Sequence, residues 1–331
     1  MNLVVVGAGT MGRWFARSVA PVVDRVAFAD EDAAAARAAV AAFEEQVAAD
    51  EVDVSGNEVV AADDGGENRD GRRNGDGGEN CDGGGNGDET VPTVAVDEGG
   101  PADVVCVAVP ISAVPDAVAE HGPRAERALL DISGEMTTAV AALEAAAPDR
   151  ERASFHPLFA PDNEPGNCAV VVDHGGPVVR EIRGVLADRG NRVFDTTPEE
   201  HDRAMATVQA RAHAAVLAFG LAADDVPEAF HTSVSGPLAD LVADVTGGNS
   251  SVYAEIQDAF DGADAVADAA RRIASAADDP EAFAALYETA SNGPFGAAGD
   301  SAAADESRDD RDAEAGAGPR SDDRQGPGDA S

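Results

Sequence analysis

A glycine-rich turn between two short apolar runs constrains this chain more than any other feature. Residues 2–6 (NLVVV) predict a β-strand, and Gly7-Ala-Gly9-Thr-Met-Gly12 follows it at once. A helix over 13–20 and a second strand over 25–29 come next, and the strand ends at Asp30. This spacing of glycines between a strand and a helix, with an acid closing the second strand, predicts a Rossmann-type dinucleotide-binding unit. The alternative is a chance glycine-rich turn in another α/β protein.

Each residue of the turn has a physical task in such a unit. Gly7 permits the tight turn, Gly9 lets the backbone approach a pyrophosphate at the helix N-terminus, and Gly12 lets helix and strand pack closely. Asp30 is placed to accept hydrogen bonds from the adenosine ribose, and its charge would repel the extra phosphate of NADP, so we expect NAD. The cofactor-binding residues predicted here are Gly7, Gly9, Thr10, Met11, Gly12, Asp30 and Pro110.

Further apolar runs alternate with helical patterns up to about residue 195. Strands are expected over 103–109, 127–132, 152–156, 168–173 and 191–195. Runs that are apolar on both faces, separated by helices, predict an α/β fold with a doubly wound, mostly parallel sheet. Ligands of such sheets bind at the carboxyl ends of the strands, which would place the glycine-rich turn, Pro110, Ser133 and His156 along one crevice.

The sequence changes character at Pro198, which follows Thr197, a good N-cap residue. Strand signals stop there, and alanine-rich helical patterns run to about residue 292. We expect an NAD-binding Rossmann domain over 1–196 and an all-helical substrate and dimerisation domain over 197–296, and hence a homodimer. Two stretches with almost no apolar surface, about 63–89 and 297–331, are predicted to be a disordered insertion and a disordered acidic tail.

The charge balance indicates the environment of the protein and excludes some classes of partner. The chain has 63 acidic residues against 23 basic ones, a net charge of −40, and every basic residue is arginine. Acid spread over all segments predicts a halophilic cytoplasm, because about 1 M salt shortens the Debye length to ~3 Å and screens the repulsion. The charge argues against nucleic acid and anionic membranes as partners. With no long apolar run and a strand directly after Met1, we expect a cytoplasmic protein without membrane span or signal peptide.

The three cysteines, Cys81, Cys106 and Cys168, lie far apart and without Cys-x-x-Cys spacing. Neither a disulfide framework nor a metal site is indicated. Cys106 and Cys168 lie in apolar strands, so we expect them to be small core residues.

Two segments carry residues suited to chemistry. The first, 154–161, contains His156, ends a strand and opens a loop toward the crevice. The second contains His201, Met205, Gln209 and His213 at four-residue spacing, so each would neighbour the next on one face of a helix.

In these segments the chain resembles the prephenate dehydrogenase family of tyrosine biosynthesis, in a form typical of haloarchaea. The resemblance covers roughly residues 1–260 and implies oxidative decarboxylation of prephenate to 4-hydroxyphenylpyruvate with reduction of NAD. A neutral imidazole suits removal of the substrate hydroxyl proton. The resemblance implies His156 as the catalytic residue, supported by Ser133, and His213 with Gln209 as substrate-binding residues. The matching pieces are the glycine-rich turn, Ala108-Val-Pro110, Asp131-Ile-Ser133, His156-Pro-Leu-Phe and His201-Asp-x-x-Met205-Ala-x-x-Gln209-x-x-x-His213.

The chain departs from the family pattern in two places. The family's Gly-Ser-Val-Lys is here residues 133–136 (SGEM), so the serine stands one place early and the lysine is absent. The arginine that grips the substrate side-chain carboxylate is expected nine residues before Tyr253, where Asp244 stands. Arg211 is the substitute candidate for substrate binding. If Asp244 faced the pocket it would attract the ammonium of arogenate, so arogenate dehydrogenase is the alternative function; otherwise Asp244 is a surface acid.

Purely structural interpretations stay open for the other candidates. His156 could cap its own turn, His213 could be an interior helix residue, and Gln209 and Arg211 could be solvated. His201 and Asp202 could be ordinary helix capping. A non-catalytic, NAD-responsive regulator is the competing class of function. β-Hydroxyacid dehydrogenases, which begin with a similar turn, use a catalytic lysine, and this chain has none.

Overall fold

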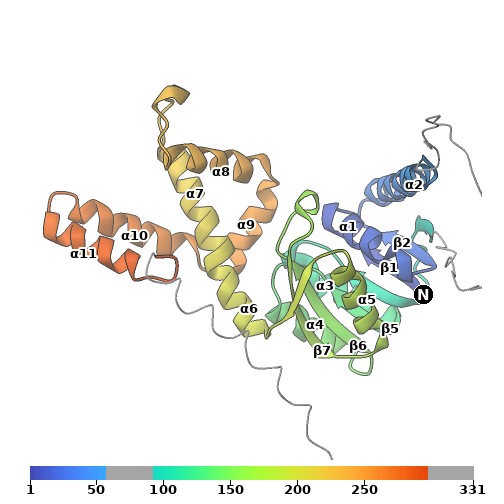
Figure 1. Cartoon of the computed structure of the whole chain (residues 1–331). Helices are drawn as coiled ribbons and strands as arrows, with labels where there is room; N and C mark the ends of the chain where they lie inside the picture. Colours follow the sequence, from blue (N-terminus) through green and yellow to red (C-terminus); the bar gives the residue numbers. More distant parts are fainter. Residues whose placement is uncertain (57–91, 297–331) are drawn as a thin grey trace, which may run out of the picture. The chain divides into compact units, whose positions relative to one another are not determined.

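The computed structural model describes residues 1–56 and 92–296 (Figure 1). The predictions for 63–89 and 297–331, together with Cys81, lie outside the described residues. The chain divides into two compact units, Met1–Val266 and Ala267–Ser331.

An eight-stranded sheet forms the centre of the first unit, with strand order β3-β2-β1-β4-β5-β6-β7-β8. Neighbouring strands pair in parallel except β6 and β7, which are antiparallel. This confirms the mostly parallel α/β fold. The strands are β1 (Asn2–Val6), β2 (Arg25–Ala29), β3 (Thr93–Val96), β4 (Ala102–Val107), β5 (Ala125–Asp131), β6 (Glu151–Pro157), β7 (Asn167–His174) and β8 (Arg192–Asp195).

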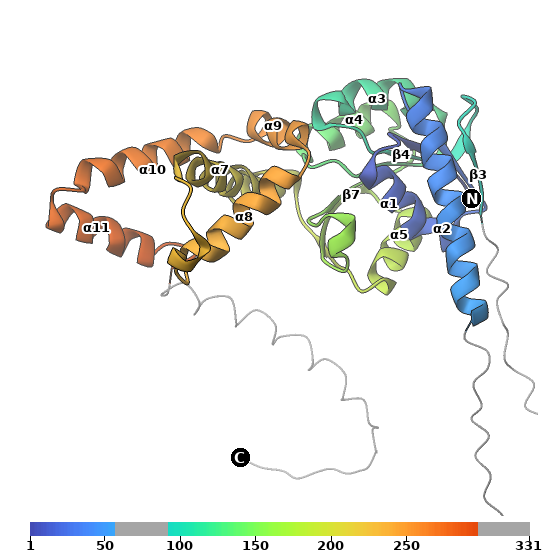
Figure 2. The same ribbon diagram turned by 90° about the horizontal axis from the view of Figure 1, so that it is seen from above.

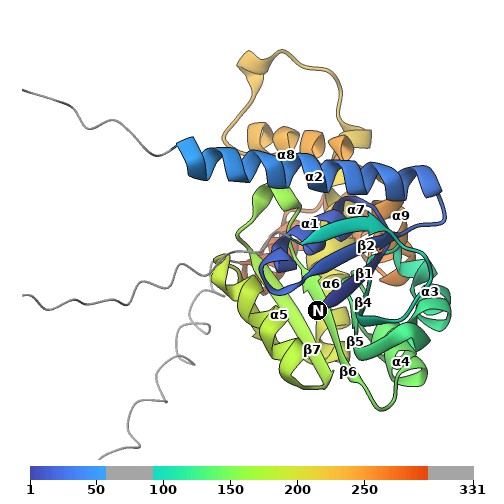
Figure 3. The ribbon, with the colours of Figure 1, turned by 90° about the vertical axis from the view of Figure 1, so that its right-hand side faces the viewer.

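Helices cover both faces of this sheet (Figure 3). One face packs against α1 (Thr10–Val19), α2 (Ala33–Gly56) and α5 (Pro177–Asp188). The other packs against α3 (Val114–His121) and α4 (Thr137–Ala146). Strand β4 shows why its sequence is apolar throughout: Cys106 belongs to the first layer and Val105 to the second, and both are fully buried. Cys106 and Cys168 are buried and free, as expected.

Between β8 and residue 296, the end of the described part, the regular elements are all helical, which confirms the predicted helical region (Figure 2). Thr197 caps the first of them, because its side chain accepts a hydrogen bond of 3.2 Å from the Glu200 amide. The helices that follow β8 in the first unit are α6 (Pro198–Met205), a π-helical segment (Ala206–Arg211), α7 (Ala212–Ala222), α8 (Ser235–Gly247) and α9 (Ser250–Ala259). Helix α10 (Ala263–Ala276) begins at the end of this unit, and α11 (Pro280–Ser291) follows in the second.

The π-helical segment changes one expectation from the sequence. The four-residue spacing from His201 to His213 predicts one α-helical face, but a π-helix bonds i to i+5 and widens the turn. Gln209 lies within the wide turn, so the four residues do not follow one regular stripe.

In the described ranges 1–56 and 92–296, no helix is long and apolar enough to cross a membrane.

Candidate active site

The glycine-rich turn is packed so closely that side chains have no room at two of its positions. Gly7 has φ +103°, and a Cβ there would lie 2.3 Å from the carbonyl oxygen of Ala108, at the end of β4. A Cβ at Gly12 would lie 2.0 Å from the carbonyl oxygen of Gly7. Gly9 differs, because no atom lies within 4 Å of the place that its Cβ would take. This open backbone before α1 can receive an anionic diphosphate, since the first amides of a helix are free to donate.

Asp30 joins the end of β2 to this turn. Its Oδ2 accepts a hydrogen bond of 2.8 Å from the Ala8 amide, and its Oδ1 accepts one of 2.9 Å from the Asp32 amide. Each carboxylate oxygen has further lone-pair capacity, so the residue can also accept from ribose hydroxyls. Pro110, the remaining cofactor candidate, is exposed directly after β4. Thr10 is exposed as well, whereas Met11 packs against the first core layer. The turn therefore fits a dinucleotide.

His156 lies near the end of β6 and forms one end of a buried hydrogen-bonded chain. Its Nδ1 is 2.8 Å from His201 Nε2, and His201 Nδ1 is 2.8 Å from Asp202 Oδ1. The two imidazoles are 8% and 2% exposed. On the other side of the His156 ring, a Cβ at Gly134 would lie 3.5 Å from Nε2.

The pKa of His156 is lowered to about 3, chiefly by burial and in part by His201, and Asp202 partly opposes the shift. A depressed pKa keeps the imidazole neutral near pH 7, where it can accept a proton. His156 thus combines a fixed position, a neutral ring and one nitrogen that does not bond to His201. These three properties allow His156 to accept a proton as a general base.

Asp202, at the other end of this hydrogen-bonded series, connects it to the N-terminus of α4. Its carboxylate accepts hydrogen bonds of 3.0 Å from the amides of Met136 and Thr137, at the N-terminus of α4, and another from the Thr137 hydroxyl. Burial opposes ionisation, but the bonds from His201, Thr137 and the amides outweigh it and lower the pKa of Asp202. The interpretation of His201 and Asp202 as capping residues of their own helix is wrong, because Thr197 caps α6. The signal that could have found them was a His-Asp pair near the start of the helix that follows the last strand.

Ser133 is turned toward a buried acid. Its hydroxyl donates to Asp131 Oδ2 at 3.0 Å, and Ser154 donates to the same oxygen at 2.8 Å. Burial raises the pKa of Asp131 to about 7, although both serine hydrogen bonds counteract the shift. Gly134 is the neighbour that closely approaches His156 Nε2. The catalytic role of Ser133 stays a prediction.

The predicted substrate residues of the helical region meet α9. The His213 ring packs edge-on against Tyr253, with centroids 4.7 Å apart, and burial lowers the pKa of His213. Gln257 donates to the carbonyl of Ala210 at 2.8 Å, within the π-helical segment. Among the described residues, five buried side-chain atoms have no hydrogen-bond partner, and three of them lie in this region: Gln209 Oε1, His213 Nδ1 and Gln257 Oε1. Sequence reasoning did not identify Gln257, which lies 47 residues from its partner Ala210.

The two charged candidates of this region lie at the surface. Arg211 is exposed and donates to the Thr207 hydroxyl at 3.3 Å. Asp244 is exposed on α8, which favours the interpretation as a surface acid. A carboxylate that the sequence did not single out does reach the sheet: Glu255 of α9 accepts from the Ile111 amide at 2.9 Å and from the Ser112 hydroxyl at 2.8 Å. Glu255 therefore ties α9 to the loop after β4, beside Pro110.

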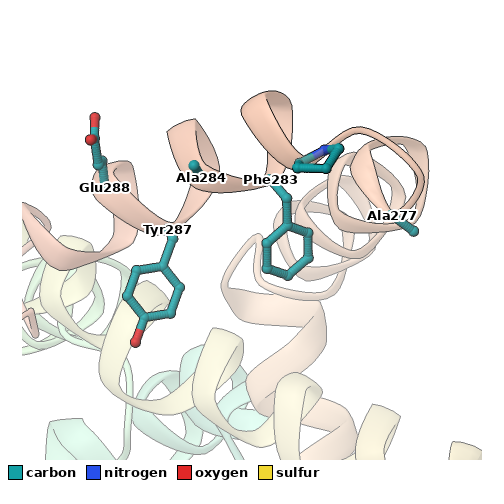
Figure 4. Close-up of a pocket in the computed structure, with 6 residues that line it drawn as sticks. Ala277, Phe283, Ala284, Tyr287 and Glu288 are labelled. Atoms are coloured by element: carbon teal, nitrogen blue, oxygen red, sulfur yellow. The ribbon is translucent and has the colours of Figure 1, made fainter.

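The second unit contains an apolar hollow of a different character. Phe283 and Tyr287 project from one side of α11 into it (Figure 4). It lacks the paired acid and base groups of the first unit, so we place the chemistry at His156. The hollow is lined by Ala277, Pro280, Phe283, Ala284, Tyr287 and Glu288.

Among the known proteins that resemble the chain in sequence or in fold are dehydrogenases of prephenate and of a derivative of it. The 4-amino-4-deoxyprephenate dehydrogenase of Streptomyces pristinaespiralis is 34% identical over 204 residues, which is 56% of this chain and 68% of that protein. No protein-family profile matches the chain. Prephenate dehydrogenase from A. aeolicus, solved with hydroxyphenyl propionate and NAD+, has a TM-score of 0.54 at 14% identity over 87% of this chain and 96% of that one. A second structure of prephenate dehydrogenase from Aquifex aeolicus gives 0.51 at 13% identity, over 87% and 96% of the two chains. At such identity these structures show a shared fold.

Proposed function

Because the chain belongs to the prephenate dehydrogenase family, we propose that it oxidises and decarboxylates prephenate to 4-hydroxyphenylpyruvate with NAD as the oxidant. One observation carries the proposal: a buried, neutral His156 is held by His201 at the carboxyl end of β6, the sheet edge at which the glycine-rich turn follows β1. The relative from Streptomyces pristinaespiralis acts, by its name, on an amino derivative of the same substrate.

The residues divide the work of this reaction. The open backbone at Gly9 receives the diphosphate and Asp30 accepts from the ribose. When bound, NAD would take the hydride from the alcohol carbon. His156 Nε2 takes the hydroxyl proton as the alcohol carbon becomes a ring carbonyl. The bond to the ring carboxylate then breaks, its electron pair moves through the ring to the carbonyl oxygen, and carbon dioxide leaves. That oxygen takes a proton back to give the phenol of the product. Burial of His156 keeps bulk water from competing for the proton.

A substrate with an amino group is the second candidate, and the buried acceptors favour it. The donor bond to Ala210 fixes the Gln257 amide so that its Oε1 is an acceptor without a donor. Gln209 Oε1 is unpartnered nearby in the same helical contact. Unsatisfied buried acceptors are costly and suit a ligand that brings N–H groups. Arogenate carries an ammonium on its side chain, and a matching arginine for a keto-carboxylate is absent at position 244.

The test is an assay of NADH formation in high salt with prephenate and with arogenate. We expect turnover with at least one of them, and a higher kcat/KM with NAD than with NADP because Asp30 repels the additional phosphate. Tight binding of NADH with neither substrate turned over would contradict the proposal and favour a non-catalytic regulator.

We also propose that the protein is a homodimer through its helical region. Helix α7 has the sequence AHAAVLAFGLA, yet it contains no buried residue. Leu221 is 88% exposed, Phe230 75% and Val234 73%, on and between α7 and α8. Exposed apolar surface on this scale is typical of an interface between subunits. Light scattering in high salt should give twice the mass of the chain, and Leu221→Glu should return it to the monomer mass. A monomer mass for the unmodified protein would contradict this proposal.

The composition supports one further proposal, a cytoplasm rich in salt as the working environment. The support is the ratio of 63 acidic to 23 basic residues and the complete absence of lysine.

A further inference from the structure

His201 separates the proposed base from its carboxylate, and this separation has a chemical purpose. In the arrangement that enzymes commonly use, an acid bonds directly to the catalytic imidazole. Here a second imidazole stands between them, with 2.8 Å on each side. We infer that His201 is a positioning residue that fixes the His156 proton on Nδ1, leaves Nε2 free as the base and keeps the charge of Asp202 one ring away.

The hydrogen bonds order the protons from the carboxylate outward. Asp202 accepts from the amides of Met136 and Thr137 and is ionised, so it can only accept. His201 Nδ1 must therefore carry a proton, and the Nε2 of a neutral His201 is an acceptor. His156 Nδ1 then donates to it, and a neutral His156 has no second proton for Nε2. A doubly protonated His201 would reverse the middle bond and place the His156 proton on Nε2.

The His201 ring weakens the effect of the Asp202 charge on the protonation of His156. A carboxylate in direct contact would raise the pKa of His156 and so increase the fraction of the ring that already carries a second proton. Through a neutral ring, Asp202 still orients His156 and stabilises the positive charge that appears when Nε2 accepts a proton. The other titratable group facing Asp202 is Glu135, which precedes α4; its pKa is raised by burial and by the Asp202 charge.

The same loop also defines the space in front of the base. Met136 and Thr137 hold Asp202, and Gly134, two residues earlier, faces His156 Nε2. One short segment before α4 therefore fixes both ends of the arrangement. A change in this segment is expected to disturb the proton order and the substrate position together.

The assignment can be read directly from the imidazole nitrogens by ¹⁵N NMR of the full chain in high salt. Between pH 6 and 8 we expect His156 as the Nδ1–H tautomer. His201→Phe should remove this preference, and His201→Gln should restore much of it, because an amide can accept from His156 and donate to Asp202. The control is His174→Gln. His174 is an exposed histidine at the end of β7, where it pairs with the start of β6, at the other end of this strand from His156. Circular dichroism confirms that each variant is folded.

Kinetics provide a second readout, which rests on the proposed function. His201→Phe should lower kcat by about 10- to 100-fold, the usual cost of a misplaced catalytic group, while KM for NAD stays unchanged; His201→Gln should recover part of the loss. An Nε2–H tautomer of His156 in the unmodified protein would overturn the inference, as would a folded His201→Phe variant with unchanged tautomer and kcat. The expected tautomer without turnover of either substrate supports the inference and contradicts the proposed function.

Discussion

Replacing His156 by asparagine is expected to lower kcat by about 10²–10⁴-fold, the usual contribution of a positioned acid–base group. Asparagine can still bond to His201, but it has no ring nitrogen to take the hydroxyl proton. Binding of NAD should persist, because the glycine-rich turn follows β1 and Asp30 follows β2, whereas the hydrogen bond of His156 is to His201. Initial rates at saturating substrate and a titration with NAD measure the two quantities.

His174→Asn is the matched control for this experiment, since His174 is exposed and lies where β7 pairs with the beginning of β6. It should have the kcat of the unmodified protein. A His156→Asn variant with nearly normal turnover would show that another group removes the proton, and Ser133 with Asp131 would be the next to test.

Lowering the salt from about 3 M to about 0.1 M KCl is expected to destabilise the fold strongly. The Debye length grows from less than ~3 Å to ~10 Å over this range, so the net charge of −40 begins to repel across neighbouring side chains. We expect Tm to fall by about 10 °C or more, since each kcal/mol shifts Tm by roughly 2–4 °C in a domain of this size. Thermal unfolding followed by circular dichroism across a salt series measures the effect. NaCl at equal ionic strength is the control for screening, and a constant Tm would contradict the halophilic interpretation.

Local features of the sequence predicted the first part of the fold well. Strand β1, the turn from Gly7 to Gly12, and β2 ending at Asp30 depend on neighbours within about thirty residues, and all occur where expected. The end of β6 at His156 followed from an apolar run that closes before a loop.

Long-range partners were beyond the reach of periodicity. Strand β3 has only four residues, Thr93–Val96, and becomes a strand by pairing with β2. The bond between His156 and His201 spans 45 residues, and that between Met136 and Asp202 spans 66. Such contacts depend on how β6, α4 and α6 pack against one another, and this packing cannot be predicted from the sequence pattern of each element.

Asp30 limits how this family member could change its cofactor. The carboxylate supports the Ala8 amide of the turn as well as the Asp32 amide, so a neutral aliphatic residue would leave two donors without an acceptor. A lineage that moved toward NADP would therefore need a replacement that removes the charge and keeps the acceptors, such as asparagine or serine, before an arginine could be useful. Asparagine or serine is therefore the expected intermediate in such a change, because the same carboxylate oxygens of Asp30 stabilise the turn and select the nucleotide.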